Sequence, residues 1–439
     1  MGKLVGSITL PDIVAAHKRG DHVGIYSICS AHPFVLEACM QQALEDGSPL
    51  LVESTSNQVN QEGGYTSMTP AGFHDYLCGI ADRFNFPRGR LILGGDHLGP
   101  NPWQHEPVES AMAKAQVLVR DCILAGYTKI HLDASMKCAD DPMDVPLSMS
   151  VSAGRAAELC LAAEETYTAA PLDQSPPCYV IGTEVPPPGG AQRHENTLAV
   201  TAVEDAQETI DLTREAFKRR GLGAAWERVV ALVVQPGVEF GDDFVFEYDS
   251  GAAAQLSQFI ATQDRLVFEA HSTDYQTRDA LRALVEDHFV ILKVGPATTF
   301  AFREAVFALG LMEVEWLAGR EGIELSNIQQ VLDDAMVENP AFWQKYYTGS
   351  ESSVQFARKY SLSDRSRYYW PNADVQQALA RLFHNLGHPV PVTLLSQYLP
   401  VQYERVRAGV LENTPRSLIY DKIRSVVADY AHACGCTEL

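Results

Sequence analysis

Short runs of apolar and β-branched residues alternate with longer segments whose apolar residues recur at helical spacing, and the alternation repeats eight times. Runs that are apolar over almost their whole length are typical of strands buried on both faces of a parallel sheet. Eight such units predict that the sheet closes into a (β/α)8 TIM barrel, an α/β fold. The predicted strands are residues 22–30, 50–54, 91–95, 129–133, 179–183, 229–234, 265–270 and 289–294.

A helical part is expected after the barrel. A barrel of this kind typically needs about 250 residues, whereas the chain has 439. Beyond residue 317 the strand signals give way to helical spacing, with candidate helices at 325–337, 341–346, 374–383 and 415–431. We therefore predict a barrel over residues 1–318 and a C-terminal helical extension over residues 319–439 that packs on the barrel or completes its site.

The chain is acidic, because 34 lysines and arginines stand against 56 aspartates and glutamates, for a formal net charge of −22. This charge disfavours nucleic acid and anionic membrane surfaces as partners, since both are negatively charged. The sequence has no apolar run of 18 residues and no targeting segment, so we expect a cytoplasmic protein. It also has neither a P-loop nor a dinucleotide-binding glycine motif, which disfavours a nucleotide cofactor.

Polar residues end nearly every predicted strand, at the face where barrel enzymes carry their chemistry. One such residue can be a simple helix cap, but a succession around the barrel indicates a site. Asp96 and His97 directly follow a strand and offer a proton-transfer group beside a metal ligand, with glycines on both sides that let other groups approach. His271 offers a second imidazole from the seventh strand, and Glu184 lies in a loop stiffened by three prolines.

These residues form the candidate catalytic and metal-binding sets. We expect Asp96, Asp133 and Glu184 to be catalytic, and His97, His271 and Glu184 to hold zinc or another divalent metal. The alternative for Asp96 and His97 is a hydrogen-bonded pair that only supports a neighbouring site, and for His271 it is a hydrogen-bonded core histidine. For Glu184 the alternative is a salt bridge that braces its loop.

An anionic substrate would need local positive groups in so acidic a chain. Lys293 precedes a Gly-Pro turn and hydroxyl residues that open a helix, a pattern that supplies N–H donors for phosphate. We assign Lys293, Ser272, Arg365 and Arg367 to binding a substrate phosphate, with the two arginines reaching over from the extension. A packed aromatic corner with exposed arginines is the alternative for residues 363–370.

Several blocks of the sequence resemble one known family. They include Gly-Gly-Asp-His-Leu-Gly-Pro-Asn at 94–101, Lys-Ile-His-Leu-Asp-Ala-Ser-Met at 129–136, Val-Val-Gln-Pro-Gly-Val-Glu-Phe at 233–240 and Tyr-Tyr-Trp-Pro at 368–371. They are similar to the non-catalytic Z subunit (GatZ/KbaZ family) of class II D-tagatose-1,6-bisphosphate aldolase, over essentially the whole chain. This family is often labelled tagatose 6-phosphate kinase, an activity that the missing nucleotide motifs do not support.

The resemblance implies a subunit without aldolase activity of its own, which supports the activity and stability of a separate catalytic class II aldolase subunit. That role belongs to galactitol or N-acetylgalactosamine catabolism, through tagatose 6-phosphate. The family is also similar to the catalytic zinc aldolases, in which an Asp-His pair and histidines from strands six and seven build the metal site. Asp96, His97 and His271 match this pattern, whereas Gln235 stands where a third histidine would be expected.

An amide in place of an imidazole should weaken zinc binding, which gives a physical reason for missing aldolase activity. An independent enzyme is the second hypothesis. In it, His97, His271 and Glu184 hold a divalent metal, and Asp96 or Asp133 moves the proton. The reaction would be 4-epimerisation or aldol cleavage of a ketose or ketose phosphate.

Overall fold

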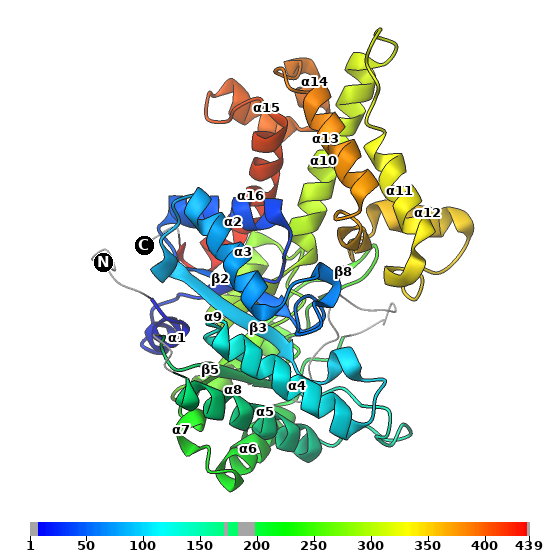
Figure 1. Cartoon of the computed structure of the whole chain (residues 1–439). Helices are drawn as coiled ribbons and strands as arrows, with labels where there is room; N and C mark the ends of the chain where they lie inside the picture. Colours follow the sequence, from blue (N-terminus) through cyan, green and yellow to red (C-terminus); the bar gives the residue numbers. More distant parts are fainter. Residues whose placement is uncertain (1–7, 171–173, 183–197, 437–439) are drawn as a thin grey trace.

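The computed structural model describes residues 8–170, 174–182 and 198–436 (Figure 1). Within them, eight parallel strands close into a barrel in the order β1-β10-β9-β6-β5-β4-β3-β2. The strands are β1 (Ile25–Ile28), β2 (Leu50–Thr55), β3 (Leu91–Leu98), β4 (Lys129–Asp133), β5 (Cys178–Gly182), β6 (Val229–Val233), β9 (Val267–Ala270) and β10 (Phe289–Val294). Each lies within or overlaps a predicted strand, so the predicted (β/α)8 barrel is confirmed.

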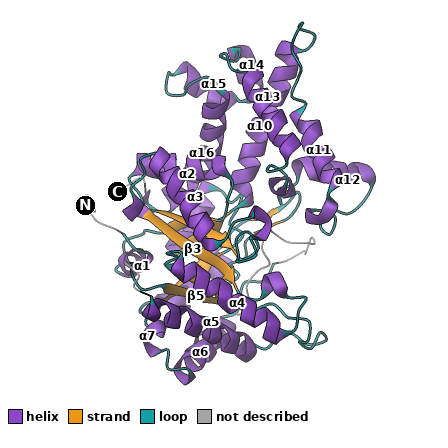
Figure 2. Cartoon of the chain, viewed as in Figure 1, coloured by secondary structure: helices purple, strands orange, loops and turns teal. Residues whose placement is uncertain are grey.

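Helices surround the strands, as Figure 2 shows. Several begin where a Ser, Thr or Asp side chain accepts a hydrogen bond from a first-turn N–H, as at Thr69, Ser148 and Thr277. The helices that follow the strands are α2 (Pro33–Asp46), α3 (Pro70–Arg83), α4 (Val108–Leu124), α5 (Met149–Ala169), α6 (Val203–Arg219), α7 (Gly223–Trp226), α8 (Ser250–Ala261), α9 (Arg278–Glu286) and α10 (Pro296–Leu317).

Two small elements were not expected from the sequence. Helix α1 (Leu10–Lys18) packs Leu10, Ile13 and Val14 against apolar residues of the strands and so covers one end of the barrel. A short antiparallel hairpin, β7 (Glu239–Phe240) with β8 (Val245–Phe246), follows β6 near the mouth.

The extension is built from helices, which lie above the barrel in Figure 1. They are α11 (Ile328–Glu338), α12 (Glu351–Tyr360), α13 (Ala373–Asn385), α14 (Val392–Tyr398), α15 (Pro400–Arg407) and α16 (Pro415–Ala433). The helix expected at 341–346 is wrong, because Pro340–Phe342 forms only a 3-10 turn that Asn339 caps. No helix among the described residues is long and apolar enough to span a membrane.

The last helix belongs to the ring of helices around the barrel. Helix α16 packs against α2, α9 and α10 and touches β1. Tyr430 of α16 is buried, and its hydroxyl donates to the carbonyl oxygen of Thr273 at 2.7 Å. Just after the helix, the carbonyl oxygen of Cys434 accepts from the N–H of Gly24, which leads into β1. The C-terminal segment is therefore part of the barrel's packing.

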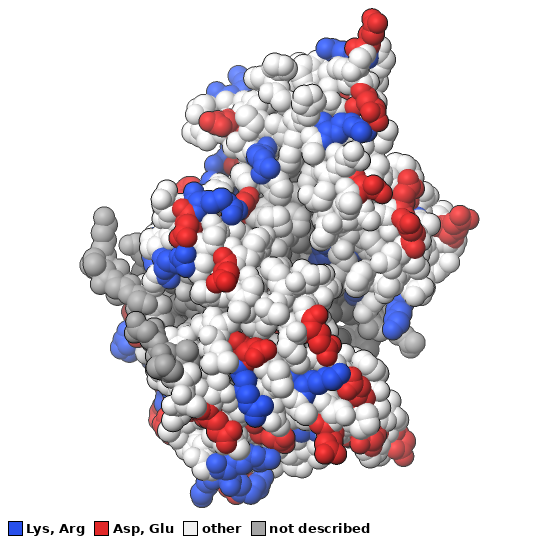
Figure 3. All heavy atoms as spheres, viewed as in Figure 1, with Lys and Arg blue, Asp and Glu red and all other residues white. Residues whose placement is uncertain are grey.

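The charge of the surface is dispersed. On the face shown in Figure 3, acidic and basic side chains are interspersed and form no large area of one sign.

Candidate active site at the barrel mouth

A layer of charged side chains crosses the barrel interior. Lys129 places its Nζ atom 2.8 and 2.7 Å from the two carboxylate oxygens of Glu53 and 2.7 Å from Oε2 of Glu269. Gly94 stands between Glu53 and Lys129 in the sheet register. A Cβ atom at Gly94 would lie 2.8 Å from Cγ of Glu53 and 3.2 Å from Cδ of Lys129. The glycine therefore leaves the space in which this buried ion pair forms.

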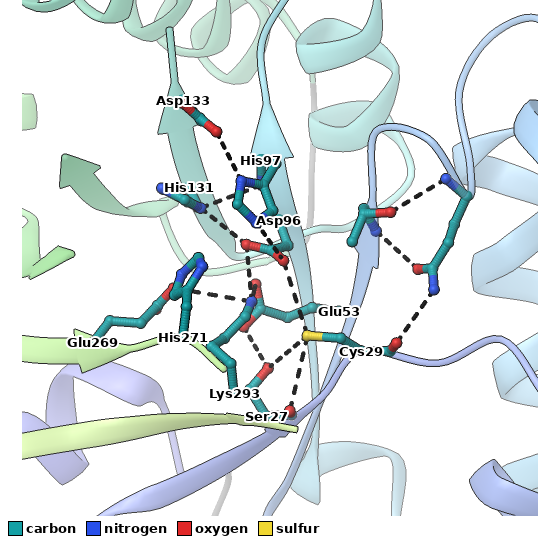
Figure 4. A network of polar contacts seen from close by, with 12 residues as sticks. Ser27, Cys29, Glu53, Asp96, His97, His131, Asp133, Glu269, His271 and Lys293 are labelled. Atoms are coloured by element: carbon teal, nitrogen blue, oxygen red, sulfur yellow. Dashed lines mark hydrogen bonds and ion pairs between the residues drawn. The ribbon is translucent and has the colours of Figure 1, made fainter. Parts of the chain in front are cut away.

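Asp96 and His97 are consecutive, yet both line the mouth (Figure 4). In a regular strand, successive side chains point to opposite faces of the sheet. The register of β3 against β4 shifts between Gly95 and Leu98, and His97 has a φ of 49°, in the left-handed region. Such a conformation costs a non-glycine residue about 1–3 kcal/mol. The irregularity brings a carboxylate and an imidazole into the site together.

Three buried histidines each contact a carboxylate at the base of the mouth (Figure 4). The pairs are His97 Nδ1 with Asp133 Oδ2 at 2.7 Å, His131 Nδ1 with Asp96 Oδ1 at 2.9 Å, and His271 Nε2 with Glu269 Oε1 at 2.9 Å. The centres of the three rings are 4.9 to 5.3 Å apart. The carboxylates orient the rings, as partners of metal-binding or proton-transferring histidines commonly do.

The carboxylates of this cluster are held in their charged form. Burial alone would raise the pKa of Asp96, but His97 and Lys293 outweigh it and hold that pKa well below its usual value. Burial would also raise the pKa of Asp133, and the hydrogen bond with His97 lowers it instead. Burial would lower the pKa of His97, but Asp96 and Asp133 raise it. Burial lowers the pKa of His271 to about 4, so that imidazole is neutral near pH 7.

Four buried side chains could hold a metal ion: Asp96, His131, Glu269 and His271 each offer a ligand atom within 4.8 Å of the other three. Zinc–ligand bonds are about 2.0–2.2 Å long, so these atoms would have to move closer together to share one ion. Nε2 of His131 is buried without a hydrogen-bond partner among the described residues, as suits a nitrogen reserved for a ligand. Nitrogen and oxygen donors of this kind fit zinc, manganese or iron.

This donor group overlaps only partly with the residues expected to bind metal. His271 belongs to it. His97 lies beside it, with Nε2 3.6 Å from Oδ2 of Asp96 and with Nδ1 engaged by Asp133. Glu184, expected both as a ligand and as a catalytic group, lies outside the described residues.

Gln235 turns its side chain to its own loop. Its Oε1 atom accepts hydrogen bonds from the N–H groups of Gly237 at 2.8 Å and Val238 at 3.0 Å. The amide oxygen thus stabilises the turn after β6. The sequence had suggested that this residue takes the place of a histidine ligand of zinc.

A cavity of about 620 Å³ opens at this cluster, between the barrel mouth and the extension. Asp96, His97, His271 and Lys293 line it from the barrel. The extension contributes Phe342, Lys345, Tyr346, Arg365, Arg367 and Tyr368. The extension therefore helps to form the site.

Arg365 is buried and Arg367 is half-buried, so the alternative of exposed arginines is wrong for this pair. Arg365 is 4% exposed. It donates to the carbonyl oxygen of Phe342 and lies over the ring of Tyr346, while its Nε atom has no hydrogen-bond partner among the described residues. Arg367 donates to the carbonyl oxygen of Asp364 and to the Tyr368 hydroxyl. Within the described part of the chain, neither guanidinium lies within 4 Å of a carboxylate.

Two of the N–H donors expected to bind phosphate at the start of α10 have a partner within the chain. Oδ1 of Asp274 accepts hydrogen bonds from the N–H groups of Gly295 at 3.0 Å and Ala297 at 2.8 Å, so those donors are already used. Ser272 lines the cavity with a φ of 53°. Lys293 also lines it, but its ammonium forms ion pairs with carboxylates of the cluster. The cationic groups left for an anion are those of the extension.

His131, Lys129 and Glu269 are site residues that were not expected from the sequence. Each stands inside an apolar strand, at a position whose side chain faces the barrel interior. A charged or imidazole side chain in a strand buried on both faces was the available signal, because such a group requires a partner from another strand.

The chain matches one protein family over nearly its whole length. The model of the D-tagatose-1,6-bisphosphate aldolase subunit GatZ/KbaZ-like family matches residues 10–435. A protein from Sinorhizobium meliloti 1021, described as a probable tagatose 6-phosphate kinase, is 45% identical, with a TM-score of 0.85. That match covers 94% of this chain and 100% of the other.

Two aldolases of known structure are far less similar. A fructose-bisphosphate aldolase from Campylobacter jejuni is 12% identical with a TM-score of 0.42, covering 91% of this chain and 95% of its own. The YdjI aldolase from Escherichia coli K12 is 10% identical with a TM-score of 0.39, covering 85% of this chain and 95% of its own. The family match and the 45% identical relative confirm the resemblance noted in the sequence. This chain belongs to the GatZ/KbaZ-like family of D-tagatose-1,6-bisphosphate aldolase subunits.

Proposed function

We propose that this chain is an accessory subunit of D-tagatose-1,6-bisphosphate aldolase, without aldolase activity when alone. It would sustain the activity and stability of a separate catalytic class II subunit during tagatose 6-phosphate breakdown, which follows galactitol or N-acetylgalactosamine uptake. Membership of a family of aldolase subunits supports this role.

The position of Gln235 is the observation that most favours the absence of intrinsic aldolase activity. Metal-dependent aldol cleavage needs a strongly Lewis-acidic ion to polarise the ketose carbonyl. The amide oxygen of Gln235 is occupied by two backbone N–H groups, so β6 supplies no metal ligand through this residue. The remaining donors are partly engaged with one another, as His131 is with Asp96 and His271 is with Glu269.

We also propose that the cavity binds a sugar phosphate, with its phosphate under Arg365 and Arg367. A buried guanidinium without a carboxylate partner is costly unless an anion compensates it. Arg365 retains an unpartnered Nε atom, and Arg367 is fixed beside it by backbone carbonyl oxygens. Ser272 lines the same cavity and would donate a hydroxyl to the ligand.

An independent metal-dependent enzyme is a second candidate, favoured by the His97–Asp133 pair. A buried carboxylate that orients a cavity-lining imidazole is the arrangement used for proton transfer. A divalent metal on Asp96, His131, Glu269 and His271 would polarise a ketose carbonyl, and His97 would hold the proton. A purified chain that converts a ketose phosphate to its 4-epimer, and loses this activity in His97→Ala, would establish this candidate.

The accessory role is tested by mixing the two subunits. The catalytic class II aldolase subunit is incubated at its inactivation temperature alone, with this chain, and with an equal mass of serum albumin, and residual cleavage activity is followed over time. We expect a longer half-life with this chain, and co-elution of the two proteins in size-exclusion chromatography. An unchanged half-life with separate elution would contradict the proposal.

A further inference from the structure

The ammonium group of Lys293 lies inside the group of donors that could hold a metal. Its Nζ atom is 2.9 Å from Oδ1 of Asp96 and 3.9 Å from Oε1 of Glu269, two of the four candidate ligands. It is also 3.0 Å from Oε2 of Glu53. The side chain comes from β10 and points into the cluster, as Figure 4 shows.

A metal ion and this ammonium would compete for the same carboxylates. An ion bound to Oδ1 of Asp96 at about 2.1 Å would lie within roughly 5 Å of Nζ. At that distance the two positive charges repel each other strongly in a site that water does not screen. Lys293 would have to leave Asp96 before the ion could bind with full strength.

The charge balance of the cluster also indicates that a divalent ion and the Lys293 ammonium replace one another. Glu53, Asp96 and Glu269 bring three negative charges, which Lys129 and Lys293 offset only in part. A divalent ion together with Lys129 would neutralise the three carboxylates with Lys293 withdrawn. Lys293 lines the 620 Å³ cavity, so its side chain has space to move toward the mouth.

We propose that Lys293 is a built-in substitute for the metal ion, which keeps the donor cluster stable when no metal is bound and weakens metal binding. The chain would then fold without metal and take up zinc only when Lys293 withdraws into the cavity. This inference goes beyond the accessory role and does not depend on it.

The test is a zinc titration of the metal-stripped chain by isothermal calorimetry, with native protein, Lys293→Met and Lys345→Met. Lys345 is exposed and lines the same cavity, so its substitution removes an equal charge without touching the donors. We expect Lys293→Met to bind zinc at least tenfold more tightly than the native chain. Lys345→Met should bind zinc with the same affinity as the native chain. Equal affinities for native and Lys293→Met would overturn the proposal.

Thermal unfolding supplies a second readout. Without metal, Lys293→Met should have a lower Tm than the native chain, because Asp96 then loses its ammonium partner and Glu53 and Glu269 keep only Lys129. Zinc should restore most of that loss in the variant and change the native Tm little. Lys293→Gln, which keeps a hydrogen-bond donor without the charge, repeats the comparison. A zinc-induced increase in Tm as large in the native chain as in both variants would contradict the proposal.

Discussion

Nδ1 of His97 lies 2.7 Å from Oδ2 of Asp133, and both side chains are buried. The imidazole comes from the irregular end of β3 and the carboxylate from the end of β4. This contact fixes the ring that borders the cavity.

Asp133→Asn should destabilise the fold by about 3–5 kcal/mol, since it removes one partner of a buried ion pair. The pKa of His97 is raised in the folded state, so its contribution is complete below about pH 6.5 and is lost as pH rises through the raised value. The pKa of Asp133 is lowered, so its contribution is lost only at acid pH. Urea unfolding should show the largest loss in the free energy of unfolding of Asp133→Asn, relative to the native chain, near pH 6 and a smaller loss at high pH. The exposed Asp144→Asn should show neither effect.

Gly94→Ala should destabilise the barrel by about 1–3 kcal/mol, the usual cost of overpacking an interior. The added methyl group would collide with the side chains of Glu53 and Lys129. Gly79→Ala is the matched control, because Gly79 lies in α3 with no atom within 4 Å of its virtual Cβ. That substitution should stabilise the protein by up to about 1 kcal/mol through helix propensity. Equal effects of the two substitutions would contradict the packing described at Gly94.

Arg365→Met should weaken the binding of D-tagatose 6-phosphate about 10- to 100-fold, as expected for one charge-assisted hydrogen-bonding group worth about 1.5–3 kcal/mol. Calorimetry with the phosphate ester and with neutral D-tagatose separates the contributions of the phosphate and the sugar. Arg365→Met should lower the affinity for the ester and leave the affinity for neutral D-tagatose unchanged. Arg320→Met removes an exposed charge elsewhere on the extension and should leave binding unchanged. Identical affinities of native chain and Arg365→Met for the ester would exclude a phosphate at this arginine.

A fragment of residues 1–318 should not form the folded barrel. Helix α16 packs against α2, α9 and α10, and the fragment would expose these apolar contacts to water. We expect an aggregated fragment, or one that lacks a cooperative thermal transition in circular dichroism. Co-expression with residues 319–439 should rescue solubility. A stable, cooperatively folding fragment would show that the barrel is independent of the extension.

The sequence was informative about the barrel because strand and helix periods are local signals. The glycines around Asp96 and His97 were likewise readable as points of close approach, and Gly94 proves to be one. The partners of buried charges were not readable, because Lys129 meets Glu53 and Glu269 only after the sheet has closed. For the same reason, the place of α16 in the helical ring could not be inferred from its position near the chain end.

The partner of the N–H groups at the start of α10 was not readable from the sequence for a related reason. The turn after Lys293 has the predicted helix start, but Asp274 from the preceding strand end accepts its N–H groups. Two helices with similar starting sequences can differ in whether a side chain from a neighbouring loop already accepts hydrogen bonds from their first N–H groups. Arg365 and Arg367 do line the cavity, and the burial of Arg365 became clear only in three dimensions.

We propose that this chain assists an aldolase without cleaving the substrate itself. The most direct measurement is tagatose 1,6-bisphosphate cleavage by the purified chain, supplied with zinc and assayed with and without the catalytic subunit. We predict no cleavage by the chain alone and slower loss of activity in the mixture. Cleavage by the lone chain, abolished in His97→Ala, would contradict the account.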